Sequence, residues 1–190
     1  MTRLVITQNI TVDGRVEMLG DWFDPADQTP DVLEELHRQD STCDAVLLGR
    51  RTFESFRGYW PAQTDDETGV TNQLNQVAKY VATSTLTDPG WVNSTILTGD
   101  VIDEVGRIKQ QPGRDMVATG SISLCHDLIA AGLVDEYRLF IYPVVQGRGR
   151  ALFPEGHEIP TLELVDHLAF SNGVACMRYQ SHTGNSSATT

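Results

Sequence analysis

Short apolar and β-branched runs alternate along the first two thirds of the chain with segments whose apolar residues recur at helical spacing. Such runs, when bounded by polar turn residues, predict β-strands. They cover residues 4–10, 45–48, 80–83, 95–97 and 116–118. Alternation of strands with helices favours right-handed crossovers and a mostly parallel sheet that carries helices on both faces.

The helices between these strands begin at recognisable capping residues. Thr29, directly before a proline, predicts the start of a helix after the first strand. Asp100 predicts a second N-cap, and Ser121 or Ser123 predicts a third. A further helix is expected to begin after Gly49, where an apolar run ends. Each predicted strand is thus followed by a helix or a short turn, as an α/β fold requires.

The pattern changes towards the C-terminus, where strands follow one another. Three strands are predicted, over residues 137–142, 162–170 and 175–180. Asn172-Gly173 lies between the last two, and this dipeptide is a strong signal for a tight hairpin. We therefore predict one α/β domain over residues 1–180, with a mostly parallel central sheet and an antiparallel C-terminal hairpin. Residues 181–190 are small and polar and are expected to form a flexible tail.

Composition narrows the possible partners. The 190-residue chain carries 14 lysines and arginines against 26 acidic residues, a formal net charge of -12. This charge would repel nucleic acids and anionic membranes, so we expect neither as a partner. Three widely spaced cysteines and no signal-like N-terminal segment favour a soluble cytoplasmic protein with reduced thiols. The cysteines show no metal-ligand spacing, and we predict no metal site.

Candidate ligand-binding residues follow three of the predicted strands. In open α/β sheets, ligands bind beyond the carboxyl ends of the strands, where helix N-termini converge. Glycines there allow close approach of the backbone, hydroxyls suit ribose and phosphate oxygens, and arginines pair with phosphates. Together, these residues predict an adenine dinucleotide across the strand ends, whereas for Gly49 or Gly120 taken alone a tight turn is the better interpretation. The residues are Gly49, Arg50, Arg51 and Thr52; Thr83 and Ser84; and Gly120, Ser121, Ile122 and Ser123.

The order of these segments resembles that of the dihydrofolate reductase superfamily. The resemblance rests on residues 11–14, 48–54, 82–86 and 117–121, and it extends through 133–137, 143–147 and 152–154. It spans about the first 180 residues in the same order. Within the superfamily the chain most resembles the reductase domain of bifunctional riboflavin-biosynthesis deaminase-reductases and its stand-alone bacterial relatives. Thr11-Val12-Asp13-Gly14 and Pro143-Val144-Val145-Gln146-Gly147 carry this closer similarity.

The resemblance implies a three-layer dihydrofolate-reductase-like fold and hydride transfer from NADPH. It places Gly49 to Thr52 near the pyrophosphate and 2′-phosphate, Thr83 and Ser84 near the adenosine ribose and its phosphate, and Gly120 to Ser123 around the pyrophosphate. The chain departs from the family at one point. In other members the last of these loops often holds two or more glycines. Here Thr119 and Ser121 flank a single glycine, Gly120.

The substrate side is less clearly marked. The segment around Trp22 resembles the tryptophan-to-acid segment of dihydrofolate reductases, which implies that Asp27 holds the substrate and helps deliver a proton. A solvated loop carboxylate is an equally good interpretation of Asp27, and Asp13 and Trp22 are the other catalytic candidates. Arg148 and Arg150 are candidates for a substrate phosphate or for covering a loop.

The resemblance therefore implies an NADPH-dependent reductase that acts on a small heterocyclic or nucleotide-like substrate, of the riboflavin-biosynthesis type. A dihydrofolate or pterin reductase is one alternative, and a non-catalytic nucleotide-binding protein is another. We also expect a homodimer, because residues 137–142 and the hairpin around Asn172-Gly173 leave apolar surface near a sheet edge.

Overall fold

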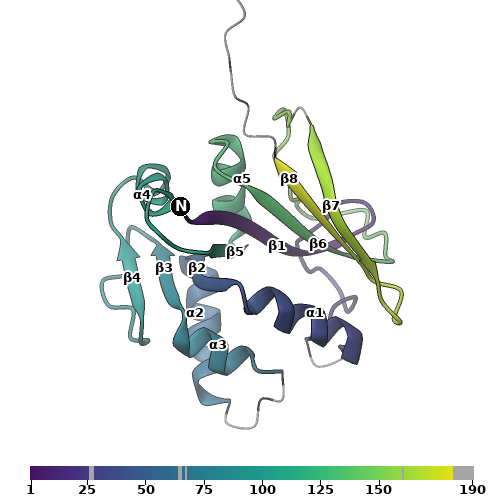
Figure 1. Ribbon diagram of the computed structural model, residues 1–190, viewed down its shortest axis with the longest axis horizontal. Coiled ribbons are helices and arrows are strands. Elements are labelled where there is room, and N and C mark those ends of the chain that lie inside the picture. Colours follow the sequence, from purple (N-terminus) through teal and green to yellow (C-terminus); the bar gives the residue numbers. More distant parts are fainter. Residues whose placement is uncertain (26–27, 64–65, 67, 160, 182–190) are drawn as a thin grey trace, which may run out of the picture.

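The computed structural model describes residues 1–25, 28–63, 66, 68–159 and 161–181. These residues form an α/β fold around an eight-stranded sheet with the order β4-β3-β2-β5-β1-β6-β8-β7 (Figure 1). The strands are β1 (Arg3–Thr11), β2 (Cys43–Gly49), β3 (Ala78–Ala82), β4 (Ser94–Leu97), β5 (Asp115–Gly120), β6 (Glu136–Tyr142), β7 (Leu162–Ala169) and β8 (Ala175–Ser181).

The sheet is parallel from β4 to β6 and antiparallel beyond it. β1 lies between β5 and β6 and pairs with both in parallel. β8 pairs antiparallel with β6 and with β7, so the last two strands form the hairpin at one end of the sheet. The predicted mostly parallel sheet with an antiparallel C-terminal hairpin is therefore confirmed.

Helices cover both faces of the sheet, which gives three layers (Figure 1). They are α1 (Pro30–Asp40), α2 (Arg50–Tyr59), α3 (Val70–Gln76), α4 (Val101–Lys109) and α5 (Ile122–Ala130), with a 3-10 turn at Trp60–Ala62. Alternate residues of β2 reach opposite layers. Leu47 packs in the cluster that contains α4 and α5, whereas Val46 and Leu48 pack with α2 and α3. Such alternation buries a central strand on both faces.

The helix starts agree with the predicted caps. Asp100 accepts hydrogen bonds from the backbone amides of Ile102 and Asp103, and Ser121 accepts one from Leu124. Thr29 occupies the predicted N-cap position, but its hydroxyl donates to the Asp31 carboxylate instead of accepting from the helix.

Most strands begin or end one or two residues away from the predicted bounds, and two of these differences have a clear structural cause. β3 begins at Ala78, two residues earlier than expected, because the strand includes a buried lysine. The Lys79 side chain is 0% exposed, and its ammonium donates to the carbonyls of Leu74 and Val77. Ser181, which we had assigned to the tail, is the last residue of β8, and its amide donates to Asp135. The remaining tail residues, 182–190, lie outside the described residues.

A buried ion-pair network crosses β5, β1, β6 and β8 near their first or last residues. Arg138 donates to Glu136 at 2.7 Å and to Asp115 at 2.6 Å, and all three side chains are almost fully buried. Burial alone raises the pKa of each carboxyl, but the hydrogen bonds from Arg138 and neighbouring groups outweigh it and hold both pKa values below normal. The network therefore favours the ionised carboxylates in the folded protein.

Candidate functional site

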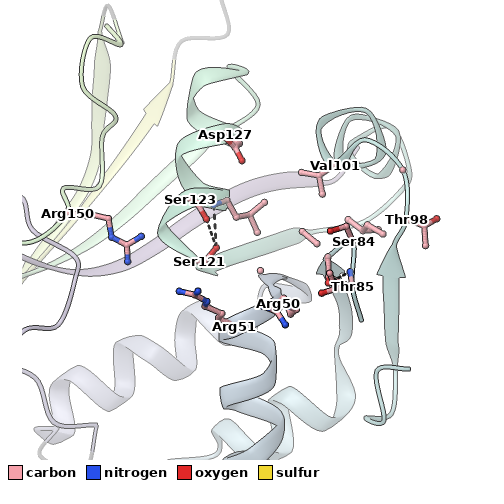
Figure 2. A pocket seen from close by; sticks show the side chains of 16 residues that line it. Arg50, Arg51, Ser84, Thr85, Thr98, Val101, Ser121, Ser123, Asp127 and Arg150 are labelled. Carbon is pink, nitrogen blue, oxygen red and sulfur yellow. Dashed lines mark hydrogen bonds between the residues drawn. The ribbon is translucent and has the colours of Figure 1, made fainter. Parts of the chain in front are cut away.

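A large cavity lies at the carboxyl ends of β2, β3, β4 and β5, where α2, α4 and α5 begin (Figure 2). Its volume is about 710 Å³, within the usual range of roughly 300–1,000 Å³ for small-molecule sites. We call it the strand-end cavity. It brings together residues from the three predicted segments, namely Gly49, Arg50, Arg51, Thr83, Ser84, Ser121 and Ser123.

Gly49 forms the junction between β2 and α2. A Cβ atom here would stand 2.5 Å from Ser121 Oγ and 3.0 Å from the Ser121 amide nitrogen, so the close approach of the β2 and β5 ends requires glycine. Gly49 is also the N-cap of α2, and it offers no side chain to the first amides of that helix. These amides and the positive end of the helix dipole suit an anionic ligand.

The arginines of the strand-end cavity differ in how firmly they are held. Arg51 makes no hydrogen bond or ion pair with any residue in the described ranges. Arg50 has only a distant contact, 3.8 Å, with Glu54. Arg150 reaches the cavity from the opposite side, where its guanidinium donates to Glu17 at 2.8 and 3.1 Å. Figure 2 shows Arg50 and Arg51 at the start of α2, with Arg150 across from them. Arg51 is thus the cation most available to a ligand phosphate.

The hydroxyl groups of the cavity also differ in whether they already make hydrogen bonds within the protein. Thr83 Oγ1 accepts from the amides of Thr85 and Leu86 and closes the turn after β3. Ser84, beside it, is exposed in the cavity. Ser121 and Ser123 lie within 3.1 Å of each other at the start of α5. The exposed residues of the lining that carry a hydroxyl are thus Ser84, Thr85, Thr98 and Ser123.

The structure places three of the predicted cofactor residues away from the cavity lining: Thr52, Gly120 and Ile122. Gly120 is buried, with a φ of +153°, and a Cβ atom there would stand 2.9 Å from Thr52 Oγ1. The side chain of Thr52 thus occupies the space that glycine leaves. In this structure Gly120 allows β5 to pack against α2, whereas the residues after it reach the cavity.

The structure describes two of the three catalytic candidates, Asp13 and Trp22. Asp27 lies outside the described residues. Asp13 is a structural clamp, because its carboxylate accepts from the Thr11 hydroxyl and from the amides of Gln146 and Gly147. The hydroxyl bond, which is the largest contribution, and the amide bonds lower the pKa of Asp13 to about 2. A group with this pKa is a poor proton donor near neutral pH.

Trp22 and the loop arginines also have structural partners. Trp22 Nε1 donates to Gln146 Oε1 at 2.8 Å, and its ring meets Tyr142 edge-on. Arg148 is exposed, and its guanidinium reaches the Leu19 carbonyl at 3.5 Å. Trp22 and Arg148 do not line the strand-end cavity. They hold together the loops that follow β1 and β6.

A second candidate region lies on the face of the sheet that α1, α2 and α3 cover. Two mainly apolar cavities of about 200 and 180 Å³ share the residues Leu36, Trp60 and Val70. We call them together the helix-face cleft. Thr119 on β5 lines it, and Ser121, two residues later, lines the strand-end cavity, so the two sites approach each other at the end of β5. Sequence reasoning missed this region, because α3 and the turn at Trp60–Ala62 were not predicted.

Asp40, the last residue of α1, is the carboxylate that lines the helix-face cleft among the described residues. Its side chain makes no hydrogen bond or ion pair within the described part of the chain. Burial raises the pKa of the Asp40 carboxyl, an effect that the nearby charges of His37 and Arg138 oppose. No signal in the sequence distinguished this residue from the other acidic residues of α1.

A strand-end cavity with arginines at a helix start, beside an apolar cleft, is a suitable arrangement for a phosphate-bearing ligand and a flat second molecule. The model of the RibD C-terminal domain family matches residues 2–176. The chain belongs to this family. Membership supports a reductase-type function and confirms the predicted resemblance to the dihydrofolate reductase superfamily.

The chain is also similar to individual proteins, one by sequence and one by fold. The chain is 32% identical over 185 residues to the uncharacterized protein YyaP of Bacillus subtilis (strain 168), covering 93% of this chain and 94% of that protein. Its fold is similar to the crystal structure of a putative riboflavin biosynthesis protein from Shewanella sp. PV-4, with a TM-score of 0.71 and 14% identity, covering 94% of this chain and 98% of that one.

Two further solved structures share the fold. A pyrimidine reductase-like protein from Corynebacterium diphtheriae gives a TM-score of 0.64 at 14% identity, with coverage of 94% and 91%. Dihydrofolate reductase from Enterococcus faecalis, complexed with NADP(H) and RAB-propyl, gives 0.62 at 16% identity, with coverage of 95% and 96%. These likenesses confirm the dihydrofolate-reductase-like fold class.

No helix in the described ranges combines the length and the apolar character that a membrane span needs. Over the same ranges, no group of three or more His, Cys, Asp or Glu side chains is arranged to hold a metal ion.

Proposed function

We propose that this protein is an NADPH-dependent reductase that transfers a hydride to a small heterocyclic substrate of the riboflavin-biosynthesis type. The observation that carries the proposal is the strand-end cavity, where Arg51 stands without a partner among the described residues at the start of α2. A phosphate that binds there displaces no internal ion pair. The cavity volume of about 710 Å³ is also compatible with much of a dinucleotide.

The residues of the cavity fit distinct parts of this cofactor. The α2 amides and Arg51 would hold phosphate groups, and the exposed hydroxyls of Ser84 and Ser123 would meet ribose or phosphate oxygens. NADPH, when bound, supplies the hydride and so the reducing chemistry. The chain would position the reacting atoms, because it offers the cofactor and the substrate two neighbouring sites, the second of them a mainly apolar cleft.

The substrate would enter the helix-face cleft. Thr7 on β1 and Thr119 on β5 lie at its sheet side, next to the strand-end cavity. A ring in the cleft would therefore be adjacent to a cofactor that spans the strand ends. The family suggests 5-amino-6-(5-phosphoribosylamino)uracil as the first substrate to test.

Two measurements test the proposal. Calorimetric titration of the purified protein with NADPH and with NADH should give a lower dissociation constant for NADPH. Oxidation of NADPH is then followed spectrophotometrically with pyrimidine ribosylamines, pterins and quinones. Equal affinity for the two cofactors would reject the cofactor assignment. Tight NADPH binding without turnover of any of these compounds would favour a non-catalytic nucleotide-binding protein.

A further inference from the structure

Positive charge is distributed very unequally between the two candidate sites. All 14 lysines and arginines of the sequence fall within the described residues, so none is missing from the comparison. Three arginines, Arg50, Arg51 and Arg150, line the strand-end cavity. In the helix-face cleft the corresponding cation is Arg138 alone among the described lining residues.

Arg138 is not available to an incoming phosphate. Its side chain is 3% exposed, and it donates to Glu136 at 2.7 Å and to Asp115 at 2.6 Å, both of which are carboxylates. A phosphate that paired with Arg138 would have to replace these bonds and leave a buried carboxylate unpaired, which is strongly unfavourable. Arg138 therefore neutralises the buried acids and does not form an anion site.

Among the described residues that line the cleft, the other charged side chain is acidic. Asp40 lines it and makes no hydrogen bond or ion pair with a described residue. In a partly dehydrated cavity, a carboxylate repels a phosphate dianion much more than it would in water. The same carboxylate attracts a ligand that presents N–H donors, because a charge-assisted hydrogen bond would supply the partner that Asp40 lacks.

The other walls of the cleft are suited to a flat ring. Leu36, Trp60 and Val70 line both of its parts, whereas Phe56 lines the larger cavity and Phe140 lines the smaller one. The two volumes, about 200 and 180 Å³, together lie near the lower end of the range for small-molecule sites. The cleft thus has room for a one- or two-ring compound surrounded by apolar and aromatic side chains.

We infer that the substrate of this protein is a planar heterocycle without a phosphate group, and that Asp40 determines this specificity by accepting hydrogen bonds from its N–H donors. The inference rests on the proposed function, since it concerns the substrate side of the same site. It departs from the phosphorylated compound that the family suggests, because here the cations are confined to the cofactor side.

The test compares a matched pair of ligands on the NADP-loaded protein. The pair is 5-amino-6-(ribosylamino)uracil and its 5′-phosphate, which differ only in the phosphate group. Calorimetry should show at least tenfold tighter binding of the unphosphorylated compound. Equal or tighter binding of the phosphate, or failure of both compounds to bind, would overturn the inference.

Variants then assign the effect to Asp40. Asp40→Asn should weaken binding of the unphosphorylated compound at least tenfold, whereas Glu34→Gln, an exposed carboxylate on the same helix, should leave it unchanged. Should Asp40→Asn unfold, Val70→Phe, which fills the junction of the two cavities, should abolish binding of the same compound. If folded Asp40→Asn binds the unphosphorylated compound as tightly as the wild type does, the role of Asp40 is refuted. If folded Val70→Phe does so, the compound does not bind in the helix-face cleft.

NADPH titration of the same preparations separates the two proposals. Wild-type protein that binds NADPH but prefers the phosphorylated uracil refutes the substrate inference and leaves the reductase proposal intact. Protein that does not bind NADPH at all refutes the proposed function itself.

Discussion

Replacing Arg51 with Gln should remove most of the preference for NADPH over NADH. A hydrogen bond to a charged group contributes about 1.5–3 kcal/mol, which corresponds to roughly ten- to hundredfold in affinity. The full effect is expected, because Arg51 has no ion pair with a described residue and so need not break one to bind a phosphate. The free energy of unfolding should change by only about 0.5 kcal/mol, as for other surface substitutions.

Calorimetric titration of both cofactors provides the assay, and the ratio of the two dissociation constants is the quantity to compare. Arg150→Gln should have a smaller effect, because the Arg150 guanidinium already donates to Glu17 at 2.8 and 3.1 Å and would have to exchange partners. Arg107→Gln on α4, outside the cavity, controls for the loss of one positive charge. A ratio in Arg51→Gln that equals the wild-type ratio would refute the assignment of this arginine.

Three further predictions concern stability, the proton donor and assembly. The pKa values of Asp115 and Glu136 lie below their ordinary values of 3.8 and 4.5. The stability that the two ionised carboxylates contribute is therefore complete above about pH 5 and is lost as the pH falls through the lowered pKa values. A midpoint of urea unfolding that stays constant down to about pH 3 would contradict this prediction. Asp27→Asn should lower turnover roughly a hundredfold with unchanged NADPH affinity, and wild-type turnover in this variant would exclude Asp27 as the proton donor. Asp13→Asn, which weakens a clamp between two loops, should instead lower the melting temperature. Light scattering should give a homodimer, twice 21.0 kDa, because β7 exposes apolar side chains at a sheet edge, and Leu168→Glu there should yield monomers; a monomeric wild type would refute the dimer.

The strands and the capped helices could be predicted because each depends on a few neighbouring residues. The run that forms β2 is apolar on both faces, as a central strand requires, and Asp100 caps α4 through two local hydrogen bonds. The tight hairpin at Asn172-Gly173 is equally local. These features survive in the fold because tertiary packing agrees with local preference.

The helix-face cleft could not be predicted in this way. α3 contains few strong helix formers and buries only Thr71 and Leu74, so its periodicity is weak. Trp60 is followed by a proline, which predicts the end of a helix. In the structure the chain continues at this point as a 3-10 turn over Trp60–Ala62. The significance of Asp40 depends on which strands and helices surround it, and that information lies in the sheet order. The strand-end residues, by contrast, share an edge in any parallel α/β sheet.

The position of β1 in the sheet has a consequence for how the chain folds during synthesis. Arg3 of β1 pairs with Asp115 of β5, 112 residues later, and Val5 pairs with Glu136 of β6. The strand is made before either partner, and loop closure over such distances slows folding. One edge of β1 lacks its partner until β5 leaves the ribosome, and the other edge lacks its partner until β6 does, so its apolar residues stay open to chaperones or aggregation over that time. We therefore expect the nascent chain to gain protease resistance in one late step, after β6 has emerged.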